Sequence, residues 1–237
     1  MIKASFGISE TGAVRGENQD AFILDTGRGV FAVADGLGGL AHGDRASRTA
    51  LELLSRKISR NGLATLKDIF QEVNAEARRT GFRLNAGGFG TTLTVARHVP
   101  EAGRVDVAHI GDSAAWLVRD GTARLLTVEH TVAARMAEAA ALPYGVEEET
   151  IPLLAHHTLT QCIGQDPYID PQAMEIPLQE GDRLFLLTDG VSKPLAEDAL
   201  RQALEQPGTL ERVCQGLTFR IELAGAPDNY TIVALEF

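Results

Sequence analysis

Three strongly apolar segments of this chain each run directly into an aspartate that has a glycine beside it. The three junctions are Asp35-Gly36, Gly111-Asp112 and Asp189-Gly190. The first and third segments are apolar on both faces, which predicts central strands that are covered on both sides. Each junction taken alone is also explained as an ordinary Asp-Gly turn. If several of these strands are neighbours, however, their ends bring the carboxylates together.

Such a set of carboxylates predicts a cation-binding site. Asp20 and Asp228 also lie at the ends of expected strands. Two carboxylates about 5 Å apart repel each other by about 3 kcal/mol at an effective dielectric of about 20, so a cluster takes up protons or binds cations. Oxygen ligands favour Mg²⁺ or Mn²⁺ over zinc, and the six histidines have no zinc-site spacing. The neighbouring glycines would let backbone carbonyls approach an ion.

Strands and helices alternate in blocks along the chain. Short β-branched or aromatic segments predict strands, whereas apolar residues at helical spacing predict helices. The expected strands are residues 2–10, 20–24, 30–35, 91–98, 105–110, 114–119, 123–127, 182–189 and 229–237. The expected helices are residues 44–59, 63–80, 131–140, 197–206 and 210–223, and residues 145–157 are expected to form a surface loop. This order predicts an α+β fold of stacked sheets with helices outside.

Turn residues separate these elements. Asp120-Gly121 predicts a hairpin between two of the strands, and Gly81 is expected to end a helix, as is Asn61-Gly62. No internal repeat or low-complexity linker divides the 237 residues. Their 44% apolar content supports one large core in a single domain.

The charge balance argues against two classes of partner. The 22 basic and 32 acidic residues give a formal net charge of −10, which disfavours nucleic acid and anionic membranes. No run of about 18 apolar residues is present, so no membrane-spanning helix is expected. The first residues lack the apolar segment of a signal peptide. Only Cys162 and Cys214 are present, without a CxxC pair, which favours a cytoplasmic protein.

Arg15 precedes Asp20 by five residues in the segment VRGENQDAF. A guanidinium beside a metal cluster is suited to bidentate binding of phosphate. The alternative is a surface arginine paired with Glu17.

Cys214 and Arg220 have the Cys-x5-Arg spacing of cysteine-dependent phosphatases, which would indicate a different chemistry. Helical periodicity runs through this segment, however, and favours packing of Cys214 in a helix.

Eight segments resemble the PPM family of metal-dependent serine/threonine phosphatases (protein phosphatase type 2C) in its compact bacterial form. They are VRGENQDAF (14–22), FAVADGLGG (31–39), GFGTTLTV (88–95), HIGDSAAWLVRDG (109–121), LTVEHT (126–131), LTQCIG (159–164), GDRLFLLTDGV (181–191) and PDNYTIV (227–233). Together, in family order over nearly the whole chain, they form a specific signal. The resemblance implies a four-layer α-β-β-α fold over residues 1–237, with a central antiparallel β-sandwich flanked by helices.

The resemblance also implies a centre that holds two Mn²⁺ or Mg²⁺ ions. Asp35 would bridge both ions, and the carbonyl of Gly36 would bind one of them. Asp189 and Asp228 would hold the other ion. Asp112, together with Asp189, would help to bind a more labile third ion.

Three further residues receive roles from the resemblance. Arg15 would bind the substrate phosphate, Asp20 would orient water from behind the ions, and Asn229 would support the loop of Asp228. The implied reaction is hydrolysis of phosphoserine or phosphothreonine by water activated between the metals, without a phosphoenzyme. The implied partner is a phosphorylated protein, either a serine/threonine kinase or one of its targets.

The chain departs from the family pattern at several positions. Gln19 stands where the family usually has Glu, Ala114 where it usually has Arg, and Leu40 where it often has a His proposed as general acid. His42 is the nearest substitute for that acid. These departures motivate an alternative, a weak or inactive module that binds a phosphoprotein or kinase. A two-metal phosphodiesterase is a third hypothesis, and an active phosphatase is the prediction because every metal carboxylate is present.

Overall fold

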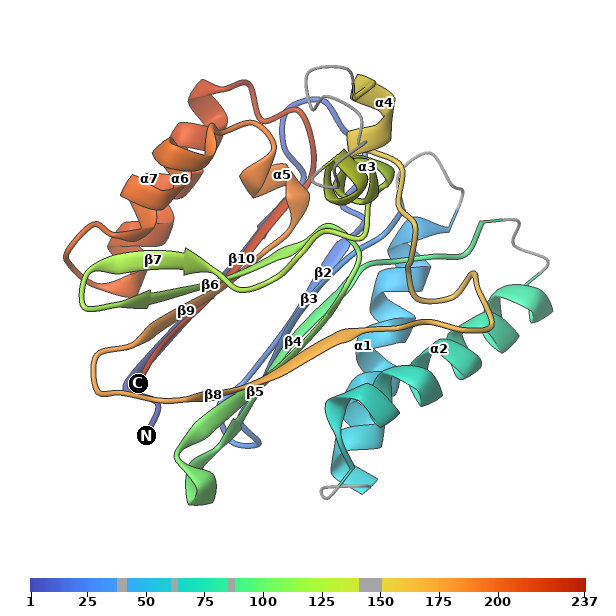
Figure 1. Ribbon diagram of the computed structural model, residues 1–237, viewed down its shortest axis with the longest axis horizontal. Coiled ribbons are helices and arrows are strands. Elements are labelled where there is room, and N and C mark those ends of the chain that lie inside the picture. Colours follow the sequence, from blue (N-terminus) through green and yellow to red (C-terminus); the bar gives the residue numbers. More distant parts are fainter. Residues whose placement is uncertain (38–41, 61–63, 85–87, 141–150) are drawn as a thin grey trace.

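The computed structural model describes residues 1–37, 42–60, 64–84, 88–140 and 151–237. Two five-stranded antiparallel sheets pack face to face, and helices cover their outer faces (Figure 1). The first sheet has the order β1 (Ala4–Glu10), β10 (Tyr230–Glu236), β9 (Arg183–Leu187), β6 (Ala114–Arg119) and β7 (Thr122–Leu125). The second has the order β2 (Asp20–Asp25), β3 (Val30–Asp35), β4 (Leu93–Val99), β5 (Arg104–Ile110) and β8 (Gln172–Pro177). The expected four-layer α+β fold is confirmed.

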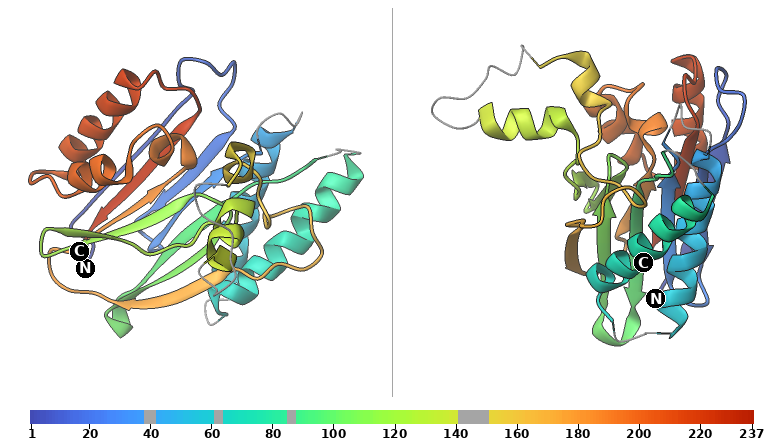
Figure 2. Two further views of the ribbon diagram at one scale, coloured as in Figure 1. Left: turned by 45° about the horizontal axis from the view of Figure 1, so that its top comes forward. Right: turned by 90° about the vertical axis from the view of Figure 1, so that its right-hand side faces the viewer.

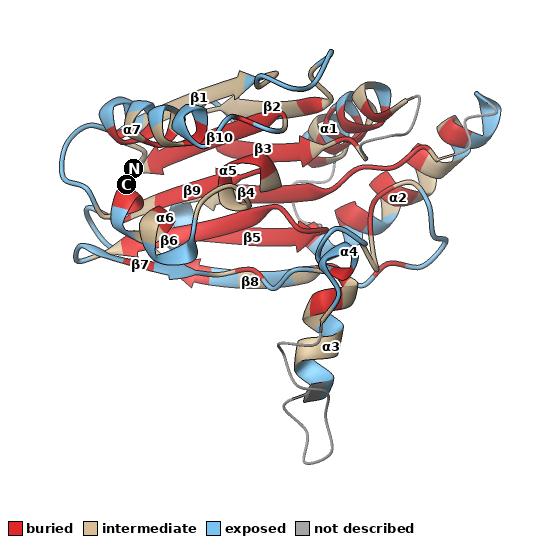
Figure 3. Ribbon diagram, turned by 90° about the horizontal axis from the view of Figure 1, so that it is seen from above, coloured by how far each residue is buried: buried red, intermediate tan, exposed pale blue. Residues whose placement is uncertain are grey.

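The helices form the two outer layers and a group at one end of the sandwich. They are α1 (Gly43–Arg60), α2 (Leu66–Arg83), the 3-10 turn η1 (Pro100–Ala102), α3 (Val132–Ala140), α4 (Leu153–His156), α5 (Asp189–Ser192), α6 (Glu197–Leu204) and α7 (Leu210–Leu223). The helices α1 and α2 cover the second sheet, and α6 and α7 cover the first. The helix α3 projects from the body of the protein (Figures 2 and 3). None of the described helices combines the length and apolar character that a membrane span requires.

Three apolar clusters hold the layers together, one between the sheets and one under each helical layer. Successive side chains of a strand point to opposite faces. Phe31 of β3 therefore packs between the sheets, while Ala32 faces α1 and α2. In β9, Leu184 packs between the sheets and Phe185 faces α6 and α7. This double coverage explains why both segments are apolar throughout.

The predicted hairpin is confirmed, but the predicted helix end at Gly81 is wrong. Asp120 and Gly121 have φ values of 51° and 74° and connect β6 to β7. Gly81 lies inside α2, where an added Cβ would meet the side chain of Phe89 at 2.7 Å. A glycine at this position therefore lets Phe89 pack closely against α2. The predicted stop at 61–62 lies outside the described residues.

Three short elements differ from the expectations. The strand β8 was not predicted, because its polar and apolar residues are not sorted between its two faces: Gln172 lies on the covered face of this edge strand, and Ala173 and Pro177 lie on the exposed face. The strand expected at 182–189 ends at Leu187, and α5 begins at Asp189. Part of the expected loop at 145–157 is the helix α4, and residues 145–150 lie outside the described residues.

Candidate metal centre

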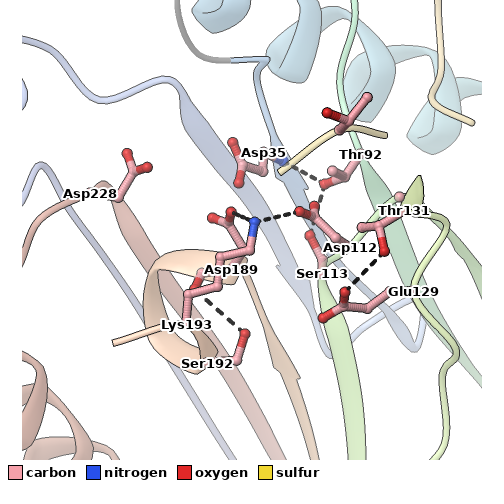
Figure 4. A network of polar contacts seen from close by, with 12 residues as sticks. Asp35, Thr92, Asp112, Ser113, Glu129, Thr131, Asp189, Ser192, Lys193 and Asp228 are labelled. Atoms are coloured by element: carbon pink, nitrogen blue, oxygen red, sulfur yellow. Dashed lines mark hydrogen bonds and ion pairs between the residues drawn. The ribbon is translucent and has the colours of Figure 1, made fainter. Parts of the chain in front are cut away.

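A cavity of about 510 Å³ lies at one end of the sandwich, beside α5. Its walls include four aspartates, Asp35, Asp112, Asp189 and Asp228 (Figure 4). Asp35 ends β3 and Asp189 starts α5 directly after β9, while Asp112 follows β5 and Asp228 precedes β10. Segments far apart in the sequence thus bring their carboxylates to one cavity, as the pattern of strand ends predicted.

Glycines beside these aspartates allow the backbone to pack closely. A Cβ on Gly36 would overlap the carbonyl oxygen of Gly43, at the start of α1. A Cβ on Gly190 would overlap the carbonyl oxygen of Asn229. Glycine at these two positions therefore lets the carboxylate-bearing turns dock against α1 and against the start of β10.

The carboxyl groups of Asp35, Asp112 and Asp189 lie close together and are buried from bulk water. Burial first, and then the charge of Asp189, raises the pKa of Asp35 well above its usual range. The same two causes raise the pKa of Asp112. Asp35 and Asp189 are also within side-chain hydrogen-bonding contact. Carboxyl groups in these surroundings hold protons unless a cation neutralises them.

Lys193 places a positive charge inside this cluster (Figure 4). Its Nζ donates to Asp112 Oδ2 at 2.7 Å and to Asp189 Oδ2 at 2.6 Å. Burial alone would raise the pKa of Asp189, but Lys193 outweighs burial and holds that pKa below its usual value. Burial also opposes the charged form of Lys193, and the two carboxylates overcome this and raise its pKa. Sequence reasoning missed Lys193, although its place one helical turn after Asp189 was visible.

Arg15 lines the same cavity and pairs with Asp228. Its Nη2 donates to Asp228 Oδ2 at 2.7 Å, and the two side chains are 43% and 35% exposed. Glu17, the alternative partner, instead accepts a hydrogen bond from Gln19 Nε2 at 2.8 Å. The arginine is therefore positioned at the cavity rather than on an unrelated surface.

Asn229 ties the segment that carries Arg15 to the segment that carries Asp228. Its Nδ2 donates to the carbonyls of Thr11 at 2.8 Å and Glu17 at 2.9 Å. Its Oδ1 accepts from the backbone N–H of Gln19 at 2.9 Å, and its own N–H donates to Asp228 Oδ1 at 2.8 Å. These bonds hold the two segments in register.

Asp20 stands opposite Asp35 in the β2–β3 register but is not among the described residues that line the cavity. Its side-chain Oδ2 accepts hydrogen bonds from Thr188 Oγ1 at 2.8 Å and Thr231 Oγ1 at 2.7 Å. These bonds join the two sheets at this end of the sandwich. Burial, partly offset by the two hydroxyls, raises the pKa of Asp20 to about 7.

Two stacked histidines support the turn that carries Asp112. The rings of His109 and His130 lie 5.2 Å apart. The N–H of Gly111 donates to His130 Nδ1 at 3.1 Å, and His109 Nε2 contacts the carbonyl of Gly111 at 3.0 Å. Burial, and then His130, lowers the pKa of His109 to about 3, so His109 is neutral. Sequence reasoning did not assign this role to either histidine.

The donor set fits hard divalent cations, because four aspartates line the cavity and supply oxygen ligands, with His157 as the one histidine among the described lining residues. Within the described residues, no three His, Cys, Asp or Glu side chains converge closely enough to hold an ion as they stand. The cations of the chain itself, Arg15 and Lys193, engage Asp228, Asp112 and Asp189 instead. Arg15 therefore competes with any ion that binds Asp228 through this oxygen.

The general acid is not identified by the cavity. Leu40 lies outside the described residues, and His42 is not among those that line the cavity. Within the described part of the chain, the histidine that lines the cavity is His157, which follows α4.

The alternative nucleophile Cys214 is buried in α7, and burial raises its pKa to about 12, so it is unsuited to thiolate chemistry.

Comparison with known proteins agrees with this architecture. The family model for protein phosphatase 2C matches residues 13–215. A putative protein phosphatase 2C-type from Streptococcus pyogenes is 30% identical over 94% of this chain and 93% of its own. The PPM Ser-Thr phosphatase MsPP from Mycobacterium smegmatis, solved with cacodylate, has a TM-score of 0.83 and 30% identity over 100% of this chain and 99% of its own.

The catalytic domain of the serine threonine protein phosphatase PstP, solved with two manganese ions, has a TM-score of 0.79 and 26% identity. Its alignment covers 98% of this chain and 97% of the PstP chain. The family match spans most of the sequence, and the arrangement of two sheets flanked by helices agrees with it. The chain therefore belongs to the protein phosphatase 2C family of serine/threonine phosphatases.

Proposed function

We propose that this protein hydrolyses phosphoserine and phosphothreonine in proteins with the help of two bound Mn²⁺ or Mg²⁺ ions. The observation that carries the proposal is the cavity in which Asp35, Asp189 and Asp228 meet beside Arg15. A phosphorylated protein, either a serine/threonine kinase or a kinase target, is the proposed substrate. The cacodylate in the MsPP structure and the manganese in the PstP structure support the same chemistry by similarity.

Three of the cavity aspartates, Asp35, Asp189 and Asp228, are the proposed ligands of the two ions. Asp35 and the carbonyl of Gly36 would hold the ions on the β3 side, and Asp189 and Asp228 on the β9 and β10 side. Two divalent ions would make a water nucleophilic at neutral pH and neutralise charge on the phosphoryl group. Their positive charge would also relieve the repulsion that raises the pKa of Asp35.

Arg15 is the proposed phosphate ligand. Its guanidinium would leave Asp228 and bind two phosphoryl oxygens, stabilising the charge that they carry in the transition state. Asn229 would keep the Arg15 segment at the correct distance through its bonds to the carbonyls of Thr11 and Glu17. Asp20 would orient water from behind Asp35, its neighbour across the strand pair.

The test compares the wild type with Asp35→Asn and Asp189→Asn in Mn²⁺-dependent hydrolysis of p-nitrophenyl phosphate and a phosphothreonine peptide. Both variants should lose turnover and Mn²⁺ binding. Asp170→Asn, at an exposed carboxylate paired with Lys67, is the matched control and should keep both. Wild-type turnover in either variant would refute the proposal. Phosphopeptide binding without turnover by the wild type would instead indicate the non-catalytic module.

A further inference from the structure

Lys193 occupies the space between two of the cavity carboxylates. It caps the C-terminus of α5, one turn after Asp189, and its N–H donates to the carbonyl of Asp189 at 2.8 Å. This turn aims the side chain back across the cavity toward Asp112, which follows a strand of the other sheet. The ammonium group contacts both Oδ2 atoms, at 2.6 and 2.7 Å, and the lysine side chain is only 25% exposed.

The position of this ammonium has a consequence for metal binding. An ion held jointly by Asp112 and Asp189 would share both carboxylates with Lys193, whose ammonium group already lies between them and holds one oxygen of each. The lysine charge would also repel a divalent cation brought next to it. A tethered lysine is moreover present at every metal concentration, whereas a weakly held ion is not.

We propose that Lys193 takes the place of the third ion, so that this cavity binds two divalent cations and Asp112 holds the lysine rather than a metal. The proposal rests on the two-metal function proposed above. Lys193 is then a positioning residue: it neutralises Asp112 and fixes one oxygen of Asp189. The other oxygen of Asp189 is left for an ion.

The experiment counts bound Mn²⁺. Crystals soaked in excess Mn²⁺ are measured by anomalous diffraction at the manganese edge, and Mn²⁺ binding in solution is followed by electron paramagnetic resonance. Lys193→Met removes the charge and keeps the aliphatic stem. Lys57→Met is the matched control, because Lys57 also bridges two carboxylates, Glu72 at 2.8 Å and Glu76 at 2.6 Å, but between α1 and α2.

The expected result is two ions in the wild type and in Lys57→Met, and three in Lys193→Met. The additional ion should lie between Asp112 and Asp189 and should disappear in the double variant Lys193→Met/Asp112→Asn. Asp112→Asn alone should still bind two ions, which tests the proposal even if Lys193→Met does not fold.

Three results would overturn the assignment of Lys193 and leave the proposed phosphatase function standing. The first is a third ion in the wild type, with Lys193 turned away. The second is a loss of one ion in Asp112→Asn. The third is a folded Lys193→Met that still binds two ions. A wild type that binds no Mn²⁺ would refute the proposed function, and this inference with it.

Discussion

Replacing Arg15 by alanine should change substrate turnover and metal binding in opposite directions. Arg15 is paired with Asp228 in this structure, and it is also the proposed ligand of the substrate phosphate. Its removal therefore takes away a phosphate contact and frees a metal ligand at the same time. A purely structural role for Arg15 would weaken both functions together.

The expected change in Mn²⁺ affinity follows from the exposure of the ion pair, and the expected change in kcat/KM follows from the strength of the phosphate contact. Arg15 and Asp228 are 43% and 35% exposed, so the pair resembles a surface ion pair, worth roughly 0.2–1 kcal/mol. Freeing Asp228 should therefore strengthen Mn²⁺ binding by no more than about fivefold. A charge-assisted hydrogen bond to phosphate is worth roughly 1.5–3 kcal/mol, so kcat/KM should fall about 10- to 150-fold.

The assay measures kcat/KM for a phosphothreonine peptide at saturating Mn²⁺ and Mn²⁺ affinity by isothermal titration calorimetry. Arg28→Ala is the control, because Arg28 forms a similar exposed pair with Asp25 at 2.6 Å outside the cavity. It should leave both quantities unchanged. Unchanged kcat/KM in Arg15→Ala, or weaker Mn²⁺ binding, would show that the reasoning is wrong.

Three other substitutions test the stability of the fold and the alternative thiol chemistry. Arg119 donates to both oxygens of Asp182, and the two side chains are 29% and 1% exposed, so Arg119→Ala should lower the free energy of unfolding by about 1.5–3 kcal/mol in urea denaturation. The pKa of His109 is about 3 in the fold against an ordinary 6.5, so the unfolded chain binds more protons and stability falls as the pH drops through 6.5. Between about pH 7.5 and about pH 5.5 the wild type should lose about 1.4 kcal/mol more than His109→Gln, and equal losses would contradict this. Cys214→Ala should keep wild-type turnover, and iodoacetamide should not inhibit the wild type; inhibition would revive a thiol mechanism.

The local pattern of the sequence predicted the framework well. The residues 30–34 and 184–187 are apolar throughout, because in the structure helices cover one face of each strand and the other sheet covers the second face. Apolar residues at helical spacing likewise predicted α1 and α7. These signals are local, since burial of a face repeats every two or every 3.6 residues along the chain.

Weaker elements escaped prediction for the same reason. The edge strand β8 is covered on one side only, and its residue types do not follow its faces, because polar Gln172 is on the covered face and Ala173 and Pro177 are on the exposed face. The helix α5 has four residues and cannot show helical periodicity. The role of Gly81 depends on Phe89, which reaches it through the tertiary fold.

The amino-acid sequence by itself determined the apolar strands, the aspartates at their ends and the arginine available to them. Only the tertiary structure decided how these charges pair. Lys193 meets Asp112 across 81 residues of chain, and Arg15 meets Asp228 across 213. Such contacts depend on how two sheets stack and where their ends meet, and no periodicity along the chain encodes that distance.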